Sequence, residues 1–157
     1  MDYLKKNQDW GILILRVALG VGFLVHGWAK ISRGTGGFEK LLNLIGVPMA
    51  NLNAQIVPYL EFLGGIAIIA GIFTRIISVP LIITMIVAMF TIHIHYGFST
   101  VNTIGLSETG PKFGPPGYEI NIVYIAGLLS LIFTGSGKYS VDEFLRIGKK
   151  INRKLNK

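Results

Sequence analysis

The sequence of 157 residues contains no cysteine. This absence excludes disulfides, thiolate metal sites, cysteine-ligated iron–sulfur clusters and thiol redox catalysis. Any redox role of the chain therefore needs a separate cofactor or a partner protein. Charge is also scarce: only 15% of the residues are Asp, Glu, Lys or Arg, and long stretches carry none. Polar residues do not recur at every third or fourth position of these stretches, which argues against the amphipathic helices of a soluble protein.

Four apolar segments have the length, or nearly the length, that a helix needs to cross a bilayer. We expect these spans at about residues 10–31, 56–73, 76–93 and 119–133. The fourth falls short of the usual length of about 20 residues. Each span should be helical, because lipid offers no hydrogen-bond partner to an open sheet edge. The sequence therefore predicts an all-α integral membrane protein, a single four-helix bundle over residues 1–157.

The distribution of basic residues predicts the orientation of this bundle. Four spans place both termini on one side of the membrane, and that side would hold Lys5, Lys6, Arg75 and the basic tail of residues 138–157. Because an excess of Lys and Arg marks the cytoplasmic side, we expect both termini in the cytoplasm and the chain in the plasma membrane. The net charge of +7 then indicates contact with lipid headgroups, and we expect no nucleic-acid partner.

Shorter patterns predict further details. Ser140, followed three residues later by Glu143, predicts the start of a short amphipathic helix in the C-terminal tail. The connections at residues 32–55 and 94–118 should lie outside, and the many Gly and Pro residues of the second predict an irregular, lid-like loop. Pairs of small residues four positions apart would let helices approach closely: Ala18 and Gly22, Ala67 and Gly71.

Glu61 is the most informative residue, because it is the only charge in the second span. A charge at the middle of an inserted helix costs about 2.5–3.5 kcal/mol. A bound proton, a cationic partner or a wet cavity would lower that cost. The predicted depths place five further ionisable residues at the same outer level: His26, Lys30, His93, His95 and Glu119. This convergence is the candidate functional site.

Within this set we expect a contact between Glu61 and His26, direct or through one water. Arg16 is the alternative partner considered, but it lies ten residues from His26 on the first span, about 15 Å further from the level of Glu61. Arg16 would instead act as a structural clamp on the inner side, with Asp142 or Glu143 as its partner.

The remaining members each have a second interpretation. Lys30 could extend to the headgroups as an anchor, which we favour over a catalytic role. His93 and His95 point in different directions on a helix, and we favour His93 as the one that faces the core. Glu119 could simply begin a helix, where a carboxylate is favourable beside the N-terminal dipole.

A histidine and a carboxylate at the outer rim fit three kinds of ligand. A quinone head group needs a hydrogen-bond donor and a proton-accepting group, and imidazole with carboxylate supplies both. Two histidines could ligate haem, although no spacing favours it, so haem is the weaker alternative. A metal site of two histidines and one glutamate is the third possibility, but no pair of ligands lies four residues apart on a helix to support it, and we predict no metal ligands.

Four groups of residues together resemble the DoxX family of small four-helix membrane proteins. They are Arg16-x-x-x-Gly20-x-x-Phe23-x-x-His26-Gly27-x-x-Lys30; Gly46-Val47-Pro48; Glu61-x-x-Gly64-Gly65 with Gly71-x-x-Thr74-Arg75; and Gly135-Ser136-Gly137-Lys138-Tyr139-Ser140-x-Asp142. The resemblance implies a similarity to the quinone-reducing DoxD subunit of an archaeal thiosulfate oxidation system and to subunits of membrane oxidoreductase complexes. It also marks five positions as special: Arg16, His26, Lys30, Glu61 and Arg75.

Two functions are therefore expected, and the sequence does not decide whether the chain is an enzyme. The first is a redox-associated membrane subunit, with oxidoreductase partner subunits, that binds a quinone-like molecule at the outer end. Its catalytic candidates are Glu61 and His26, its further ligand-binding candidates are Lys30, His93 and Glu119, and Arg16 and Arg75 are structural. The alternative is a non-enzymatic assembly, scaffold or transport component. A homo-oligomer is compatible with both.

Overall fold

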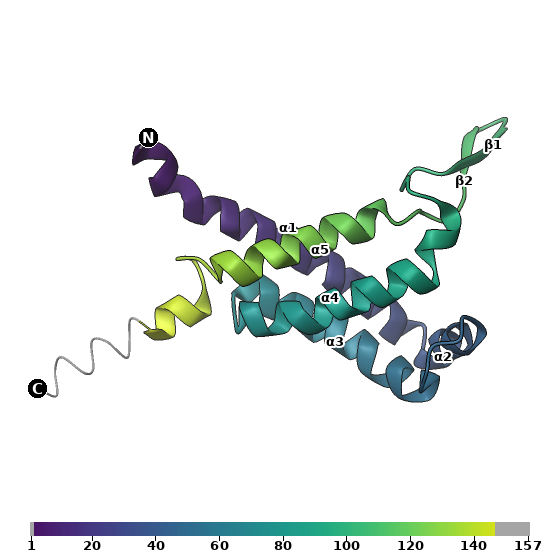
Figure 1. Cartoon of the computed structure of the whole chain (residues 1–157), viewed down its shortest axis with the longest axis horizontal. Helices are drawn as coiled ribbons and strands as arrows, with labels where there is room; N and C mark the ends of the chain where they lie inside the picture. Colours follow the sequence, from purple (N-terminus) through teal and green to yellow (C-terminus); the bar gives the residue numbers. More distant parts are fainter. Residues whose placement is uncertain (1, 147–157) are drawn as a thin grey trace, which may run out of the picture.

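The computed structural model describes residues 2–146 and is mainly helical (Figure 1). Four long helices form the bundle: α1 (Asp2–Ser32), α3 (Ala50–Ala70), α4 (Thr74–Thr91) and α5 (Glu119–Thr134). The connections hold four short elements: α2 (Thr35–Leu44), the 3₁₀ helix η1 (His93–Tyr96), and strands β1 (Thr103–Ser107) and β2 (Gly110–Phe113). α1, α3 and α4 are long and apolar enough to cross a membrane, and α5 is a shorter apolar helix. The membrane-type all-α bundle is thus confirmed.

The long helices run back and forth, so the bundle has two distinct ends (Figure 1). The start of α1 lies beside the segment that follows α5, because the Asp9 carboxylate accepts a hydrogen bond of 3.0 Å from the backbone N–H of Lys138. We call this the terminal end. The opposite end carries α2 and the β1–β2 hairpin, and we call it the loop end.

Glycines bring α1 and α3 into backbone contact. A Cβ atom at Gly27 would lie 2.4 Å from the backbone nitrogen of Phe62 and 2.7 Å from the carbonyl oxygen of Pro58. One at Gly65 would lie 2.6 Å from the carbonyl oxygen of Gly20. Because real Cβ atoms do not approach backbone so closely, only glycine permits this helix crossing.

The predicted pairs of small residues do not form this crossing. Gly22 faces α5 instead, where an added Cβ would overlap the Tyr124 hydroxyl. Ala18 is exposed. Gly71 ends α3 with φ at 71°, a left-handed conformation that favours glycine. The spacing of small residues in the sequence correctly predicted that small residues bring the helices together. It did not identify which small residues lie on the contacting faces of α1 and α3.

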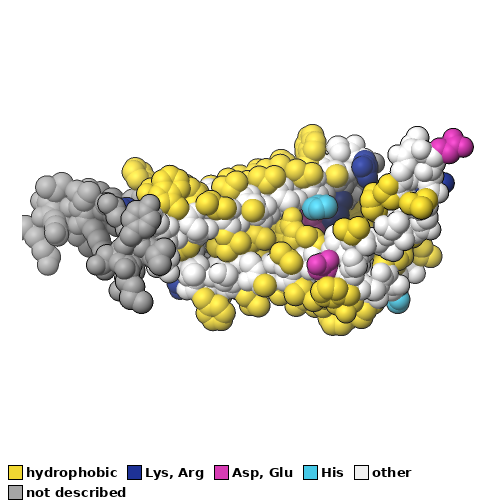
Figure 2. Space-filling model, turned by 90° about the horizontal axis from the view of Figure 1, so that it is seen from above, with side chains coloured by type: hydrophobic (Ala, Val, Ile, Leu, Met, Phe, Trp, Pro, Cys, Tyr) yellow, Lys and Arg dark blue, Asp and Glu magenta, His cyan; other side chains and the backbone are white. Residues whose placement is uncertain are grey.

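The core draws on all four long helices. Its fully buried apolar side chains are Leu19, Phe23, Ile68, Leu81, Leu128 and Leu131. Most other large apolar side chains point outward and cover the bundle along its length (Figure 2). Such a surface is suited to lipid rather than water.

Both long connections contain secondary structure. α2 packs on the start of α3 through a small cluster that includes Leu42, Ala50 and Ala54. The second connection, expected to be irregular, contains the antiparallel β1–β2 hairpin. In the tail, the Glu143 N–H donates to the Ser140 hydroxyl at 3.2 Å, and residues 141–146 are helical as predicted. The rest of the predicted amphipathic helix lies outside the described residues.

Candidate functional site

The loop end contains a charged pair between α1 and α3. The Lys30 ammonium donates a hydrogen bond of 2.6 Å to one carboxylate oxygen of Glu61 and also contacts the other. Glu61 is buried, with 3% of its side chain exposed, whereas 27% of the Lys30 side chain is exposed. The ammonium also lies 5.0 Å from the centre of the Phe38 ring of α2, a cation–π distance.

This pairing corrects the expected contact between Glu61 and His26, and it also corrects the interpretation of Lys30 as a headgroup anchor. The reason is the rotation of α1. Gly27 faces α3 directly, so the preceding residue, His26, points about 100° away around the helix and is exposed. Lys30 lies three residues after Gly27 and therefore shares its face.

The other ionisable residues of the expected cluster hold the second connection in place. The His93 ring nitrogen Nδ1 forms a hydrogen bond of 2.9 Å with the carbonyl of Pro116. The Glu119 carboxylate accepts one of 2.9 Å from the backbone N–H of Thr100. His93 and Glu119 are half-buried and His95 is exposed. Glu61 and the five further residues thus share the loop end, but the direct ionic contact joins Lys30 and Glu61.

Around the pair, charged and apolar side chains are mixed. Figure 2 shows a histidine among basic and acidic side chains toward one end of the apolar surface. On the outer flank of the α1–α3 contact, the rings of Trp28 and Phe62 lie 5.7 Å apart between centroids.

Asn121 is a buried polar residue that the sequence interpretation missed. It lies in α5 with 2% exposure, and its side-chain N–H donates to the Met85 carbonyl of α4 at 3.3 Å. Its amide oxygen has no hydrogen-bond partner among residues 2–146. The signal was present in the sequence, because Asn121 is the one amide side chain of the fourth span.

At the terminal end, Arg16 is buried and acts as a clamp, on the side that the sequence predicted. Its guanidinium donates to the carbonyl oxygens of four residues: Ile68 (2.9 Å), Ile69, Ser136 (2.6 Å) and Tyr139 (2.8 Å). The acceptors are therefore backbone carbonyls rather than the expected carboxylates. Asp142 instead accepts the backbone N–H of Phe73 at 3.2 Å. Glu143 forms an exposed ion pair with Arg146.

Arg75 is exposed at the same end, beside the end of α5. Its guanidinium donates to the Phe133 carbonyl at 3.3 Å and packs over Gly135. A cation at a helix C-terminus is favourable, because the last carbonyls carry partial negative charge. In the described part of the chain, no three His, Asp or Glu side chains gather as a set of metal ligands.

Comparison with known proteins agrees with this membrane fold. The DoxX family model matches residues 11–94, more than half of the chain. "Inner membrane protein YqjF" of Escherichia coli (strain K12) is 30% identical over 142 residues, which cover 90% of this chain and 97% of the relative. "Putative oxidoreductase CatD" of Bacillus subtilis (strain 168) is 29% identical over 147 residues, 94% of this chain and 96% of the relative.

A further relative, "Inner membrane protein YphA" of Escherichia coli (strain K12), is 29% identical over 131 residues, 83% of this chain and 87% of the relative. No solved structure is significantly similar to the chain. The family match and the full-length relatives together identify the chain as a membrane protein that belongs to the DoxX family.

Proposed function

We propose that this protein is a membrane subunit of an oxidoreductase or quinone-linked redox system, and that it binds a lipophilic small molecule at the loop end. The observation that carries the proposal is the ion pair between buried Glu61 and partly exposed Lys30, at a contact between two helices long enough to cross a membrane. The relative named "Putative oxidoreductase CatD" supports the redox association.

Packing alone does not account for this pair. The contact between α1 and α3 is made by glycine backbone, so the helices do not need an ionic link to meet there. Replacing a buried ion pair by apolar residues of similar volume is often neutral or stabilising. Charged residues within membrane spans commonly mark ligand or ion paths instead.

The chemistry of the pair suits a quinone head group. The partly exposed Lys30 ammonium is within reach of a ligand and would donate a hydrogen bond to a quinone carbonyl. Glu61 would hold the ammonium in place and accept a proton from a reduced head group. Exposed His26, one turn earlier on α1, would lie at the entrance. Haem is less favoured, because no spacing of the histidines indicates axial ligation and His93 Nδ1 is already hydrogen-bonded to the Pro116 carbonyl.

We further propose that the terminal end faces the cytoplasm, so that the ligand site opens toward the outer face of the plasma membrane. The basic residues support this orientation, because Arg75, Lys138 and Arg146 all lie at the terminal end. Positive residues are retained on the cytoplasmic side.

The test is a titration of the purified full chain with decylubiquinone, in which quenching of tryptophan fluorescence reports binding. Glu61→Gln and Lys30→Met should each raise the Kd at least about tenfold, the effect of losing one charge-assisted hydrogen bond. The double variant should bind no more weakly than either single variant, because the two residues act as a unit. Lys40→Met, on exposed α2, is the matched control. Unchanged affinity in both single variants would refute the proposed site.

The β1–β2 hairpin favours a second candidate function, that of a non-enzymatic assembly component. Ile104 and Leu106 are 66% and 82% exposed, and Phe113 on the paired strand is exposed as well. Their apolar surface would dock a partner subunit at the outer face. A stoichiometric partner that co-purifies with the wild type but not with Leu106→Ser, in a preparation that holds no organic cofactor, would support this alternative.

A further inference from the structure

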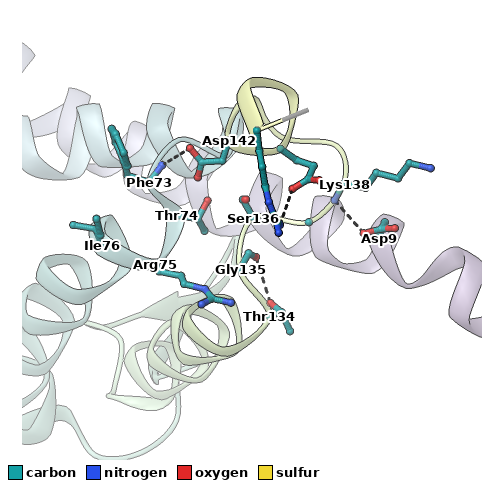
Figure 3. A pocket seen from close by; sticks show the side chains of 13 residues that line it. Asp9, Phe73, Thr74, Arg75, Ile76, Thr134, Gly135, Ser136, Lys138 and Asp142 are labelled. Carbon is teal, nitrogen blue, oxygen red and sulfur yellow. Dashed lines mark hydrogen bonds and ion pairs between the residues drawn. The ribbon is translucent and has the colours of Figure 1, made fainter. Parts of the chain in front are cut away.

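The terminal end contains a pocket that the proposed redox site does not use. It has a volume of about 660 Å³ and lies between the start of α4, the turn after α5 and the helical segment of the tail (Figure 3). Its charged lining residues are Asp9, Arg75, Lys138, Asp142, Glu143 and Arg146. The equal numbers of acidic and basic side chains distinguish it from a simple basic patch.

Part of the pocket lining offers hydrogen-bond donors. Arg75 is exposed and has five N–H groups. Within residues 2–146 it donates one hydrogen bond, to the Phe133 carbonyl, so its other N–H groups are available to a ligand. Thr74 is 1% exposed, and its hydroxyl oxygen has no hydrogen-bond partner among residues 2–146. In Figure 3 this hydroxyl points into the pocket from the first turn of α4. Backbone N–H groups at a helix N-terminus attract phosphate, so the three donors favour the same kind of ligand.

Acidic side chains also line the pocket: Asp142 lies beside the start of α4, and Asp9 lies on α1 (Figure 3). The carboxylate of Asp142 accepts the N–H of Phe73, and that of Asp9 accepts the N–H of Lys138, so both are fixed in place. A purely anionic ligand would be repelled by these carboxylates. A ligand with both a phosphate and an ammonium group matches this mixture of donors and carboxylates.

The pocket also lies where a phospholipid headgroup would be. It is at the start of α4, which is long and apolar enough to cross a membrane, and at the end of the shorter apolar helix α5. Phospholipid headgroups occupy the layer just outside the hydrocarbon core. Three large apolar side chains beside it are exposed by 63–79%: Phe73, Ile76 and Phe133. These side chains would pack against the acyl chains of a lipid whose headgroup enters the pocket.

We propose that this pocket binds the headgroup of phosphatidylethanolamine. Arg75, the Thr74 hydroxyl and the start of α4 hold its phosphate. Asp142 and Asp9 accept hydrogen bonds from its primary ammonium. Phosphatidylcholine satisfies the same charges, but its quaternary ammonium has no N–H to donate, so the pocket distinguishes the two lipids.

The test is native mass spectrometry of the delipidated full chain in detergent, titrated in turn with dioleoyl phosphatidylethanolamine, phosphatidylcholine, phosphatidylglycerol and inorganic phosphate. Phosphatidylethanolamine should bind at the lowest concentration. Arg75→Gln should weaken it about tenfold, and Thr74→Val, which keeps the side-chain volume, about threefold. Arg75→Lys should recover part of the affinity. Arg33→Gln, at the exposed loop end, is the matched control and should bind like the wild type.

Several results would overturn the proposal. Equal binding of the three lipids would contradict a headgroup-specific pocket, and tighter binding of phosphatidylglycerol would contradict the role of the carboxylates. Binding of inorganic phosphate with the same dependence on Arg75 would identify a free-phosphate site instead. Unchanged lipid binding by Thr74→Val and Arg75→Gln would place the lipid elsewhere. None of these results bears on quinone binding at the loop end, so the two proposals fail separately.

Discussion

Replacing Arg16 with methionine keeps much of the length of this side chain and removes all of its N–H donors. We expect this variant to be the most destabilising single change at the terminal end. Arg16 donates to four carbonyl oxygens: those of Ile68, Ile69, Ser136 and Tyr139. It thereby joins the end of α3 to the segment that follows α5.

The magnitude follows from the acceptors left behind. The Ile68 carbonyl also accepts from the N–H of Gly71, so it keeps one partner. In the described part of the chain, the other three carbonyls have no further donor. An unsatisfied buried acceptor costs about 1–3 kcal/mol, which gives a range of about 3–9 kcal/mol for three. Because these carbonyls are only partly buried and water can reach them, the lower part of the range, about 3–5 kcal/mol, is expected.

The assay is unfolding of the purified protein in mixed micelles as the SDS fraction is raised. Circular dichroism measures the loss of helix, from which the free energy of unfolding is obtained. The stability of Arg16→Lys should lie between those of the wild type and Arg16→Met. An ammonium has three N–H donors, but it lacks the planar guanidinium geometry that reaches several carbonyls at once. Arg33→Met, at the exposed end of α1, is the control. Wild-type stability of Arg16→Met would refute the carbonyl clamp. Wild-type stability of Arg16→Lys, together with severe destabilisation by Asp142→Asn, would show that charge pairing with Asp142 carries the stabilisation.

Two further predictions concern packing and topology. Gly27→Ala should lower the free energy of unfolding by about 1–3 kcal/mol in the same SDS titration, because the added methyl group would overlap the backbone of α3. Gly36→Ala is the control and should have little effect, because a Cβ atom added there meets no atom within 4 Å. A cysteine introduced at Thr109, in the hairpin turn, should react with an impermeant maleimide on intact cells, whereas one at Lys138 should react only after lysis. The reverse labelling pattern would invert the proposed orientation.

The positions of the spans follow directly from the sequence, because apolar runs of bilayer length have few other uses. The helical segment after Ser140 follows from its capping residues in the same way. α2 was also within reach of the sequence. The apolar residues Phe38, Leu41 and Leu42 of α2, with Ile45 at its C-cap, have the spacing of an amphipathic helix.

The hairpin and the pairing of Glu61 were harder to predict. The hairpin turn at Glu108 and Thr109 lacks the Asn-Gly or Gly-rich signature of two-residue loops. Depth along a span placed His26, Lys30 and Glu61 at one level, but depth does not fix the rotation of a helix. That rotation depends on the backbone contact at Gly27, which requires knowledge of the partner helix.

The acceptors of Arg16 also determine the order in which the protein can be completed during synthesis. Lys30 and Glu61 are separated by 31 residues, so their pair can form once the second span has left the ribosome. Two acceptors of Arg16, by contrast, lie 120 and 123 residues further along the chain. The nascent protein must therefore hold an incompletely paired arginine in its first span until the last span has been inserted. Truncation before Ser136 would leave this charge without half of its partners, a condition that membrane quality-control proteases could recognise.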